Sequence, residues 1–201
     1  MNDMSSAYST HVGPPGVGPI TLPVSPLSTD QYLRMIDAGI LDDEKVELIG
    51  GIITPMAPAG SDHNGSLYYL TRVFSQVLDR FELAIQGTIV IAEGNVFDPD
   101  LALLRLRPDG YRKSLARPED IALIIESAAS SLKKDRHVKL PVYASAGIQE
   151  YWIADLEGGI LTVFRDPDGT EYRSEQAYAV DQMVSPLACA DLSIRVADIL
   201  G

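Results

Sequence analysis

Two carboxylates stand at the ends of short apolar runs in the sequence. Glu126 follows the five apolar residues Ile121–Ile125, a pattern typical of a strand that is buried on both faces. Asp100 comes directly before a second apolar run, Leu101–Leu104. If the two runs form neighbouring antiparallel strands, the start of one lies beside the end of the other, and both acids meet at one edge of the sheet.

Two carboxylates that meet at a sheet edge repel each other unless a proton or a cation separates them. Mg²⁺, or Mn²⁺ in its place, takes oxygen ligands, and Mg²⁺ usually keeps several of its waters. The pattern therefore favours a divalent metal site at Asp100 and Glu126. The alternative is that Glu126 caps the next helix or pairs with Lys133, which is the commoner role for a lone glutamate. The second carboxylate and the basic residues nearby favour the metal.

The charge distribution gives two conflicting signals about a nucleic-acid partner. The net charge of -12 argues against one, because an acidic protein repels phosphate. Residues 105–139, however, hold nine basic and five acidic residues, whereas the remaining residues hold seven basic and 23 acidic ones. The basic excess lies on both sides of Glu126. It is either a solvated surface loop, which is commoner, or a surface that contacts phosphates.

The order of apolar patterns and turn residues predicts an α/β or α+β fold with a mixed sheet and helices beside it. Pro and Gly over residues 1–27 predict a flexible tail, and residues 28–201 form the predicted domain. Ser28 and Gln31 fit a capping box at the start of a helix. The remaining expected elements are a hairpin at Gly50–Gly51, a helix over 61–81 capped by Ser61 or Asp62, strands over 84–92, 100–106 and 121–126, a helical segment over 135–147 that Pro141 interrupts, and strands over 150–156, 160–166 and 171–180.

Composition excludes several other kinds of protein. The chain has 201 residues, 46% of them hydrophobic, and no run of the roughly 20 apolar residues that a membrane span needs. One cysteine, Cys189, excludes an internal disulfide and any zinc site that needs two cysteines. The N-terminus shows no secretion signal, so we expect a cytoplasmic protein without a membrane partner. The sequence leaves open whether it forms a homodimer.

Several motifs occur in a characteristic order: VELIGG, SDH, DPDLALL, IIESAASSLKKDRHVKLPVYASAGIQEYWIADL and LTVFRD. Over residues 28–200 this set resembles the Uma-two family of endonucleases, which belongs to the PD-(D/E)XK restriction-endonuclease-like superfamily. The most specific part is the pattern D-x3-K-x3-YA-x2-GI-x-EYW-x2-D. The resemblance implies a restriction-endonuclease-like core with a mixed, mostly antiparallel sheet, and Mg²⁺-dependent hydrolysis of DNA phosphodiester bonds.

The resemblance also implies roles for single residues. Asp100 matches the acid of the PD element and Glu126 matches the acid of (D/E)XK. The lysine of that element falls on Ala128, which departs from the superfamily pattern, and Lys139 from the following helix is expected to supply the cation instead. Glu47 matches an early glutamate of the family and could add a third carboxylate. It could equally be a hairpin residue that faces water. The implied metal ligands are Asp100, Glu126, Glu47 and the backbone carbonyl of Ser127.

Two further expectations concern binding. Basic residues near Glu126 are expected to contact DNA phosphates: Lys133, Lys134, Arg136, Arg112 and Lys113. Asp135, Lys139 and Tyr143 have helical spacing and could share one face, although Asp135 and Lys139 could also be a simple surface ion pair. We expect His63 to be a structural hydrogen-bonding residue. The rival to a nuclease is a catalytically inactive binding or regulatory module, which Ala128 and the negative net charge both favour.

Overall fold

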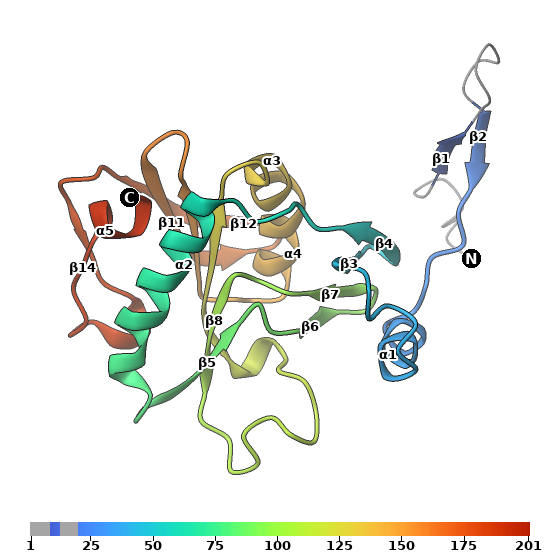
Figure 1. Ribbon diagram of the computed structural model, residues 1–201, viewed down its shortest axis with the longest axis horizontal. Helices are drawn as coiled ribbons and strands as arrows, with labels where there is room; N and C mark the ends of the chain where they lie inside the picture. The colour runs from blue at the N-terminus through green and yellow to red at the C-terminus, as the bar shows by residue number, and fades with distance from the viewer. Residues whose placement is uncertain (1–8, 13–19) are drawn as a thin grey trace.

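The largest part of the structure is a six-stranded sheet. The protein is described by a computed structural model that covers residues 9–12 and 20–201. The strand order is β12-β11-β10-β9-β8-β5, and every neighbouring pair is antiparallel except β9 and β10. Figure 1 labels β5, β8, β11 and β12 of this sheet. The strands are β5 (Phe81–Ile85), β8 (Leu101–Arg105), β9 (Ile121–Ala128), β10 (Glu150–Asp155), β11 (Ile160–Asp168) and β12 (Glu171–Tyr178). The expected mixed, mostly antiparallel sheet is confirmed.

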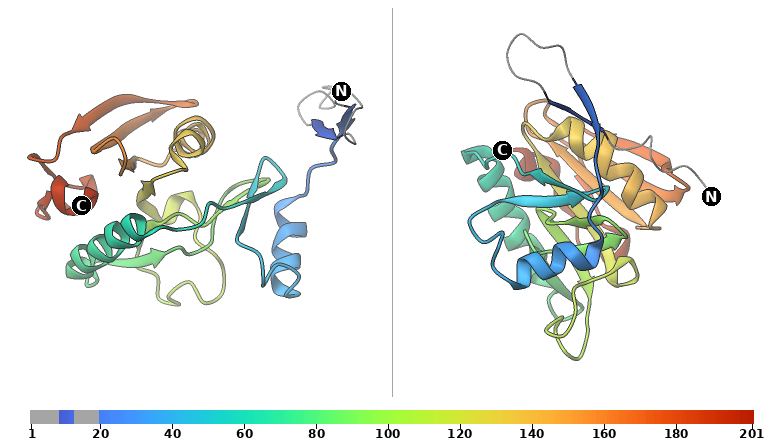
Figure 2. Two further views of the ribbon diagram at one scale, coloured as in Figure 1. Left: turned by 45° about the horizontal axis from the view of Figure 1, so that its top comes forward. Right: turned by 90° about the vertical axis from the view of Figure 1, so that its right-hand side faces the viewer.

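The parallel pair β9 and β10 requires a crossover connection, and this connection is helical. It consists of α3 (Leu132–Lys134), η4 (Asp135–Lys139) and α4 (Leu140–Ser145), drawn in gold in Figure 2. η4 is a π-helical turn, in which the N–H of Leu140 donates to the carbonyl of Asp135. Pro141, which has no N–H to donate, lies in the first turn of α4, as expected.

A second, four-stranded sheet has the order β4-β3-β7-β6. Its strands are β3 (Val46–Ile49), β4 (Ile52–Pro55), β6 (Ile89–Ala92) and β7 (Asn95–Phe97). The predicted hairpin joins β3 and β4, and both turn glycines have positive φ, 57° at Gly50 and 79° at Gly51. The helix α1 (Thr29–Asp37) begins with the predicted capping box of Ser28 and Gln31. Its Tyr32 packs on this sheet.

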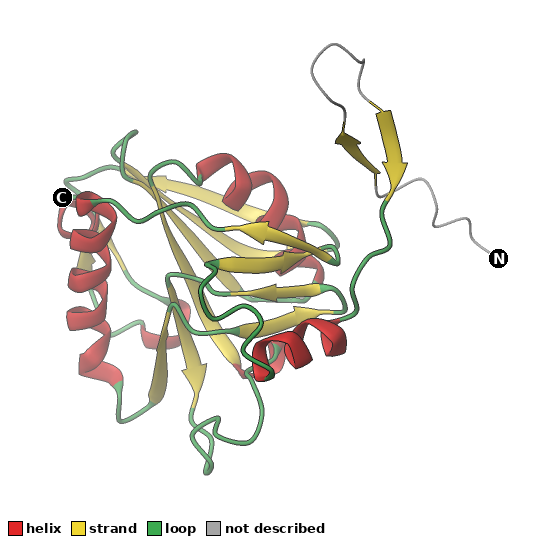
Figure 3. Ribbon diagram, turned by 45° about the vertical axis from the view of Figure 1, so that its right-hand side comes forward, coloured by secondary structure: helices red, strands yellow, loops and turns green. Residues whose placement is uncertain are grey.

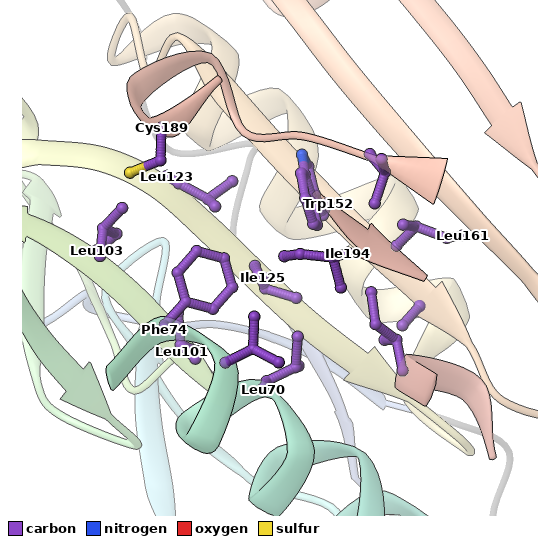
Figure 4. Packing of buried hydrophobic residues seen from close by; sticks show 14 of the residues in the cluster. Leu70, Phe74, Leu101, Leu103, Leu123, Ile125, Trp152, Leu161, Cys189 and Ile194 are labelled. Carbon is purple, nitrogen blue, oxygen red and sulfur yellow. The ribbon is translucent and has the colours of Figure 1, made fainter. Parts of the chain in front are cut away.

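Helices lie on both faces of the large sheet (Figure 3). On one face, α2 (Ser61–Phe74) and α5 (Val196–Leu200) pack on a core that includes Leu70, Phe74, Ile125 and Trp152 (Figure 4). On the other face, a second core contains Ile124, Tyr143, Tyr151 and Phe164. Because successive strand residues point to opposite faces, Glu126 lies on the same side as Ile124, the side of the crossover.

The structure corrects two predicted elements. The helix expected over 61–81 ends at Phe74, followed by the short turn η2 (Ser75–Val77), and Phe81 begins β5. The N-cap of α2 is Gly60, not Ser61 or Asp62, and no side chain caps this helix. The strand expected over 84–92 is two strands, because the chain turns at Gln86, where φ is 47°. The strand β7 was not predicted.

The N-terminal segment contributes a separate two-stranded ribbon, β1 (Ser9–Val12) with β2 (Ile20–Pro23). The rest of the predicted tail, residues 1–8 and 13–19, lies outside the described residues. The chain reaches the second sheet at Leu27, whose N–H donates to the carbonyl of Gly51 at 2.8 Å. Short elements complete the described chain: η3 (Pro118–Asp120), β13 (Met183–Val184), η5 (Leu187–Cys189) and β14 (Ile194–Arg195). Within residues 9–12 and 20–201, no helix is long and apolar enough to cross a membrane.

Candidate active site

Asp100 and Glu126 meet as expected. The antiparallel register pairs Leu101 with Ile125, which sets Asp100 opposite Glu126. The backbone N–H of Asp100 donates to Glu126 Oε2 at 3.3 Å, and the N–H of Ser127 donates to Asp100 Oδ2 at 2.8 Å. Both acids are buried, with exposed fractions of 7% and 4%. Glu126 is not the last residue of its strand, because β9 continues through Ala128.

Lys139 brings a cation to Glu126. Its Nζ lies 2.8 Å from Glu126 Oε1, 2.7 Å from Glu47 Oε1 and 4.0 Å from Asp135 Oδ1. The hydroxyl of Tyr143 also donates to Glu126 Oε1, at 3.3 Å. Burial lowers the pKa of Lys139, but attraction to Glu126 and Glu47 outweighs burial, so its pKa is raised and the ammonium form is kept. Glu126 therefore pairs with Lys139, and it neither caps the next helix nor pairs with Lys133.

Glu47 faces the interior and not the water. Val46 and Leu48 pack in the core beneath α1, so the alternation of the strand turns Glu47 to the opposite side, where it is 1% exposed. Its Oε2 lies 3.0 Å from the Nζ of Lys134. Burial raises the pKa of Glu47, but Lys139 and Lys134 lower it by more. The pKa of Glu47 is therefore lowered, and the carboxylate form is favoured.

A cavity of about 210 Å³ opens beside these side chains, and acids outnumber cations around it. The acids that line it are Glu44, Asp98, Asp100, Glu126 and Asp135, and the lysines are Lys45, Lys134 and Lys139. Glu44 and Lys45 are exposed, and the buried Glu47 contacts Lys134 and Lys139 without lining the cavity. Burial is the main cause that raises the pKa of Glu126, to about 8, and Asp135, Asp100 and Glu47 add repulsion that Lys139 opposes. Burial likewise raises the pKa of Asp98 and of Asp135. This excess of buried negative charge calls for protons or a further cation.

The donor atoms at this cavity suit a hard divalent ion. Oδ2 of Asp135 is buried and has no hydrogen-bond partner among the described residues. In the same part of the chain, no group of three His, Cys, Asp or Glu side chains is arranged to hold a metal. Mg²⁺ does not need such a group, because one or two carboxylates and several waters are its usual ligands in proteins. Asp100 and Glu126, with the neighbouring carbonyl of Ser127, fit that requirement.

Comparison with known proteins places the chain in a family. A family model described as "Putative restriction endonuclease" and named Uma2 matches residues 29–197. The chain belongs to the Uma2 family. A crystal structure described as a "putative nuclease" from Anabaena variabilis ATCC 29413 has the same fold as this Uma2 chain, with a TM-score of 0.68 and 16% sequence identity. The match covers 87% of this chain and 98% of that one. No curated protein matches the sequence.

The basic residues of this Uma2 chain lie in different places. Lys134 lines the cavity, whereas Lys133, next to it, is exposed outside the cavity. Arg136 pairs with Glu175. Arg112 and Lys113 are exposed in the loop after β8, at the opposite end of that strand from Asp100. Of the five residues expected to contact phosphates, the structure brings only Lys134 to the cavity, and phosphate contact by all five stays a prediction.

Two side chains at this Uma2 site were not among the expected site residues. His63, in the first turn of α2, has its Nε2 2.8 Å from Asp100 Oδ1, and this hydrogen bond is the main cause that raises the pKa of His63. The role expected for His63 was that of a hydrogen-bonding residue, and it does bond, but to an acid of the site. Asp98 lies between β7 and β8, near Glu47. Its signal in the sequence is the DPD motif, which places it two residues before Asp100.

Proposed function

We propose that this protein is a metal-dependent nuclease that hydrolyses phosphodiester bonds in DNA. The observation that carries the proposal is the contact of Lys139 Nζ with Glu126, opposite Asp100, at one cavity. Two carboxylates and a lysine are the residue types that metal-assisted phosphodiester hydrolysis uses. The family match and the shared fold support the same reaction class.

Asp100, Glu126 and the carbonyl of Ser127 would hold Mg²⁺ or Mn²⁺. When bound there, the ion would neutralise charge on the phosphate and lower the pKa of a water. His63 and the N–H of Ser127 each bond one oxygen of the Asp100 carboxylate, which fixes its orientation. An acid that is held in this way needs no rearrangement when the substrate arrives.

Lys139 would supply the positive charge at the scissile phosphate. Its ammonium is protonated, held by two carboxylates, and 2% exposed. A hydrogen-bond donor fixed in a site that excludes water can orient the attacking water or stabilise charge that develops on the phosphate oxygens. The surrounding side chains, among them the ring of Phe97 with its centroid 5.5 Å from Nζ, limit solvent access to this ammonium.

The placement of Lys139 also weakens the rival function of an inactive binding module. One argument for that function is the lack of a lysine at Ala128. Ala128 is fully buried in the core of the crossover face, and Lys139 reaches Glu126 from the crossover. The net charge of -12 remains an argument against broad DNA contact.

Plasmid cleavage tests the proposal directly. Purified protein is incubated with supercoiled plasmid in Mg²⁺, Mn²⁺ or EDTA, with the Asp100→Asn variant as the control for a contaminating nuclease. We expect nicked or linear plasmid only with the wild-type protein and a metal. A single-stranded DNA and an RNA of equal length are assayed in parallel. Failure to cut any DNA with either metal would overturn the proposal, and cleavage of RNA alone would overturn the choice of DNA.

A further inference from the structure

The carboxylate of Glu47 is occupied on both oxygens. Oε1 lies 2.7 Å from Lys139 Nζ and accepts from the N–H of Asp98 at 3.2 Å. Oε2 accepts from Lys134 Nζ at 3.0 Å. Asp100 and Glu126 are also bonded on both oxygens, but they line the cavity, whereas Glu47 does not line it and has no open side toward a metal ion there.

Glu47 joins two parts of the fold that are far apart in the sequence. It lies on β3 of the second sheet, whereas Lys134 and Lys139 lie on the crossover between β9 and β10. Lys134 ends α3, and Lys139 ends the π-helical turn that follows. One buried carboxylate therefore fixes two ammonium groups that come from successive turns.

The two lysines differ in their access to the cavity. The side chain of Lys139 is 3% exposed and touches Glu126. That of Lys134 is 23% exposed, and Glu47 is its one carboxylate partner within residues 9–12 and 20–201. Lys134 also lines the cavity, together with Ser130 and Ser131. An ammonium that keeps free donors and remains accessible to a ligand can bind a phosphate oxygen.

We propose that Glu47 is a positioning residue for two lysines and not a metal ligand: it holds Lys139 against Glu126 and presents Lys134 to a phosphate of the substrate. The role of Lys134 toward the substrate rests on the proposed nuclease function. The contacts of Glu47 with the two lysines do not depend on that function. The two lysines then have different tasks. Lys134 binds the phosphate in the ground state, and Lys139 acts in the chemical step.

The Glu47→Gln variant separates the two lysines. The amide oxygen of the new side chain can still accept from Lys139 and from the N–H of Asp98. The amide NH₂ would then face Lys134, and two donors cannot bond each other. We therefore expect Glu47→Gln to release Lys134 and keep Lys139, whereas Glu47→Ala releases both.

The first measurement is metal binding without substrate, by titration with Mn²⁺. We expect Glu47→Gln to change the Mn²⁺ affinity far less than Asp100→Asn does, with the exposed Glu119→Gln as a control for loss of one negative charge. Equal losses of affinity in Glu47→Gln and Asp100→Asn would overturn the positioning role. This arm does not depend on cleavage, so it tests Glu47 even if the protein cuts no DNA and the proposed function fails.

The second measurement is steady-state cleavage of a short DNA oligonucleotide. We expect Lys134→Ala and Glu47→Gln each to raise KM about tenfold with kcat nearly unchanged, as loss of one bond to a charged group predicts. Lys134→Arg keeps the charge and should restore KM. Arg173→Ala, which removes one positive charge from an exposed side chain on β12, is the control and should change KM by less than about twofold. A kcat loss in Glu47→Gln as large as in Glu47→Ala, or equal KM effects in Arg173→Ala and Lys134→Ala, would contradict the proposal.

Discussion

The ammonium of Lys139 lies 2.8 Å from Glu126 Oε1, although 13 residues separate the two in the sequence. The superfamily pattern would set the lysine two residues after the acid, at Ala128. That position is fully buried among apolar side chains on the crossover face, where a charged side chain would lack water. The crossover therefore delivers the cation that the strand does not carry.

Loss of either strand acid should abolish metal-dependent cleavage. Asp100→Asn and Glu126→Gln keep the size of each side chain but remove the negative charge that would hold the ion. We expect cleavage rates at least about a hundredfold below wild type, with an unchanged circular dichroism spectrum. Full activity in either variant would show that the acid is not part of the site.

The metal-free protein should become less stable as the pH rises through the range in which Glu126 ionises. Burial raises the pKa of Glu126 from 4.5 to about 8. Between these two values the folded protein binds more protons than the unfolded chain, so the free energy of unfolding decreases with increasing pH. Glu126→Gln cannot ionise, and this part of the decrease disappears.

Thermal melts in EDTA at pH 6 and pH 8.5 measure this effect. We expect the melting temperature of Glu126→Gln, relative to that of wild type, to rise by a few degrees between pH 6 and pH 8.5. Asp98 and Asp135, whose pKa values burial also raises, remain in both proteins, so the difference reports the ionisation of Glu126 together with its repulsion of Asp135. Parallel pH dependence in the two proteins would contradict the assignment.

Residues 1–23 should be dispensable for folding, whereas Leu27 to Thr29 should not. Thr29 is buried, its Oγ1 accepts from the N–H of Gly94 at 2.8 Å, and its own N–H donates to Glu93. A protein that starts at Val24 should melt within about 2 °C of the full chain. One that starts at Asp30 also loses the Ser28 cap, which alone is worth about 1 kcal/mol, and should melt clearly lower. Equal melting of the two truncated proteins would contradict this distinction.

Local patterns in the sequence predicted those parts of the fold that neighbouring residues determine. The capping box needs only Ser28 and Gln31, and the hairpin needs only two glycines that tolerate positive φ. The prediction of a helix through Phe81 was wrong, because it relied on apolar spacing alone. Val77 and Phe81 pack in the same core as Leu70, but from a 3-10 turn and a strand. Apolar spacing shows which residues are buried and not which backbone buries them.

The candidate site was predictable where it depends on the pairing of two strands, and less so where it depends on the crossover. The prediction that Asp100 and Glu126 meet needed only the antiparallel pairing of β8 and β9. Lys133 and Lys134 look alike in the sequence, yet one faces solvent and the other faces the cavity. The π-helical turn Asp135–Lys139 follows these two lysines and departs from α-helical spacing. Helical periodicity therefore cannot assign which side chains of the crossover turn inward.

Single-turnover cleavage by variants of Lys139 shows whether this residue supplies the cation of the site. Lys139→Ala and Lys139→Met are compared with Lys133→Ala under saturating DNA and Mg²⁺. Lys139→Met keeps an unbranched side chain that fills the space of the lysine, and it serves as the second variant in case Lys139→Ala does not fold. Thermal melts show whether each variant is folded. We expect a rate about a hundredfold or more below wild type for the Lys139 variants and a near wild-type rate for Lys133→Ala. A folded Lys139 variant that cuts DNA at the wild-type rate would contradict this role of Lys139.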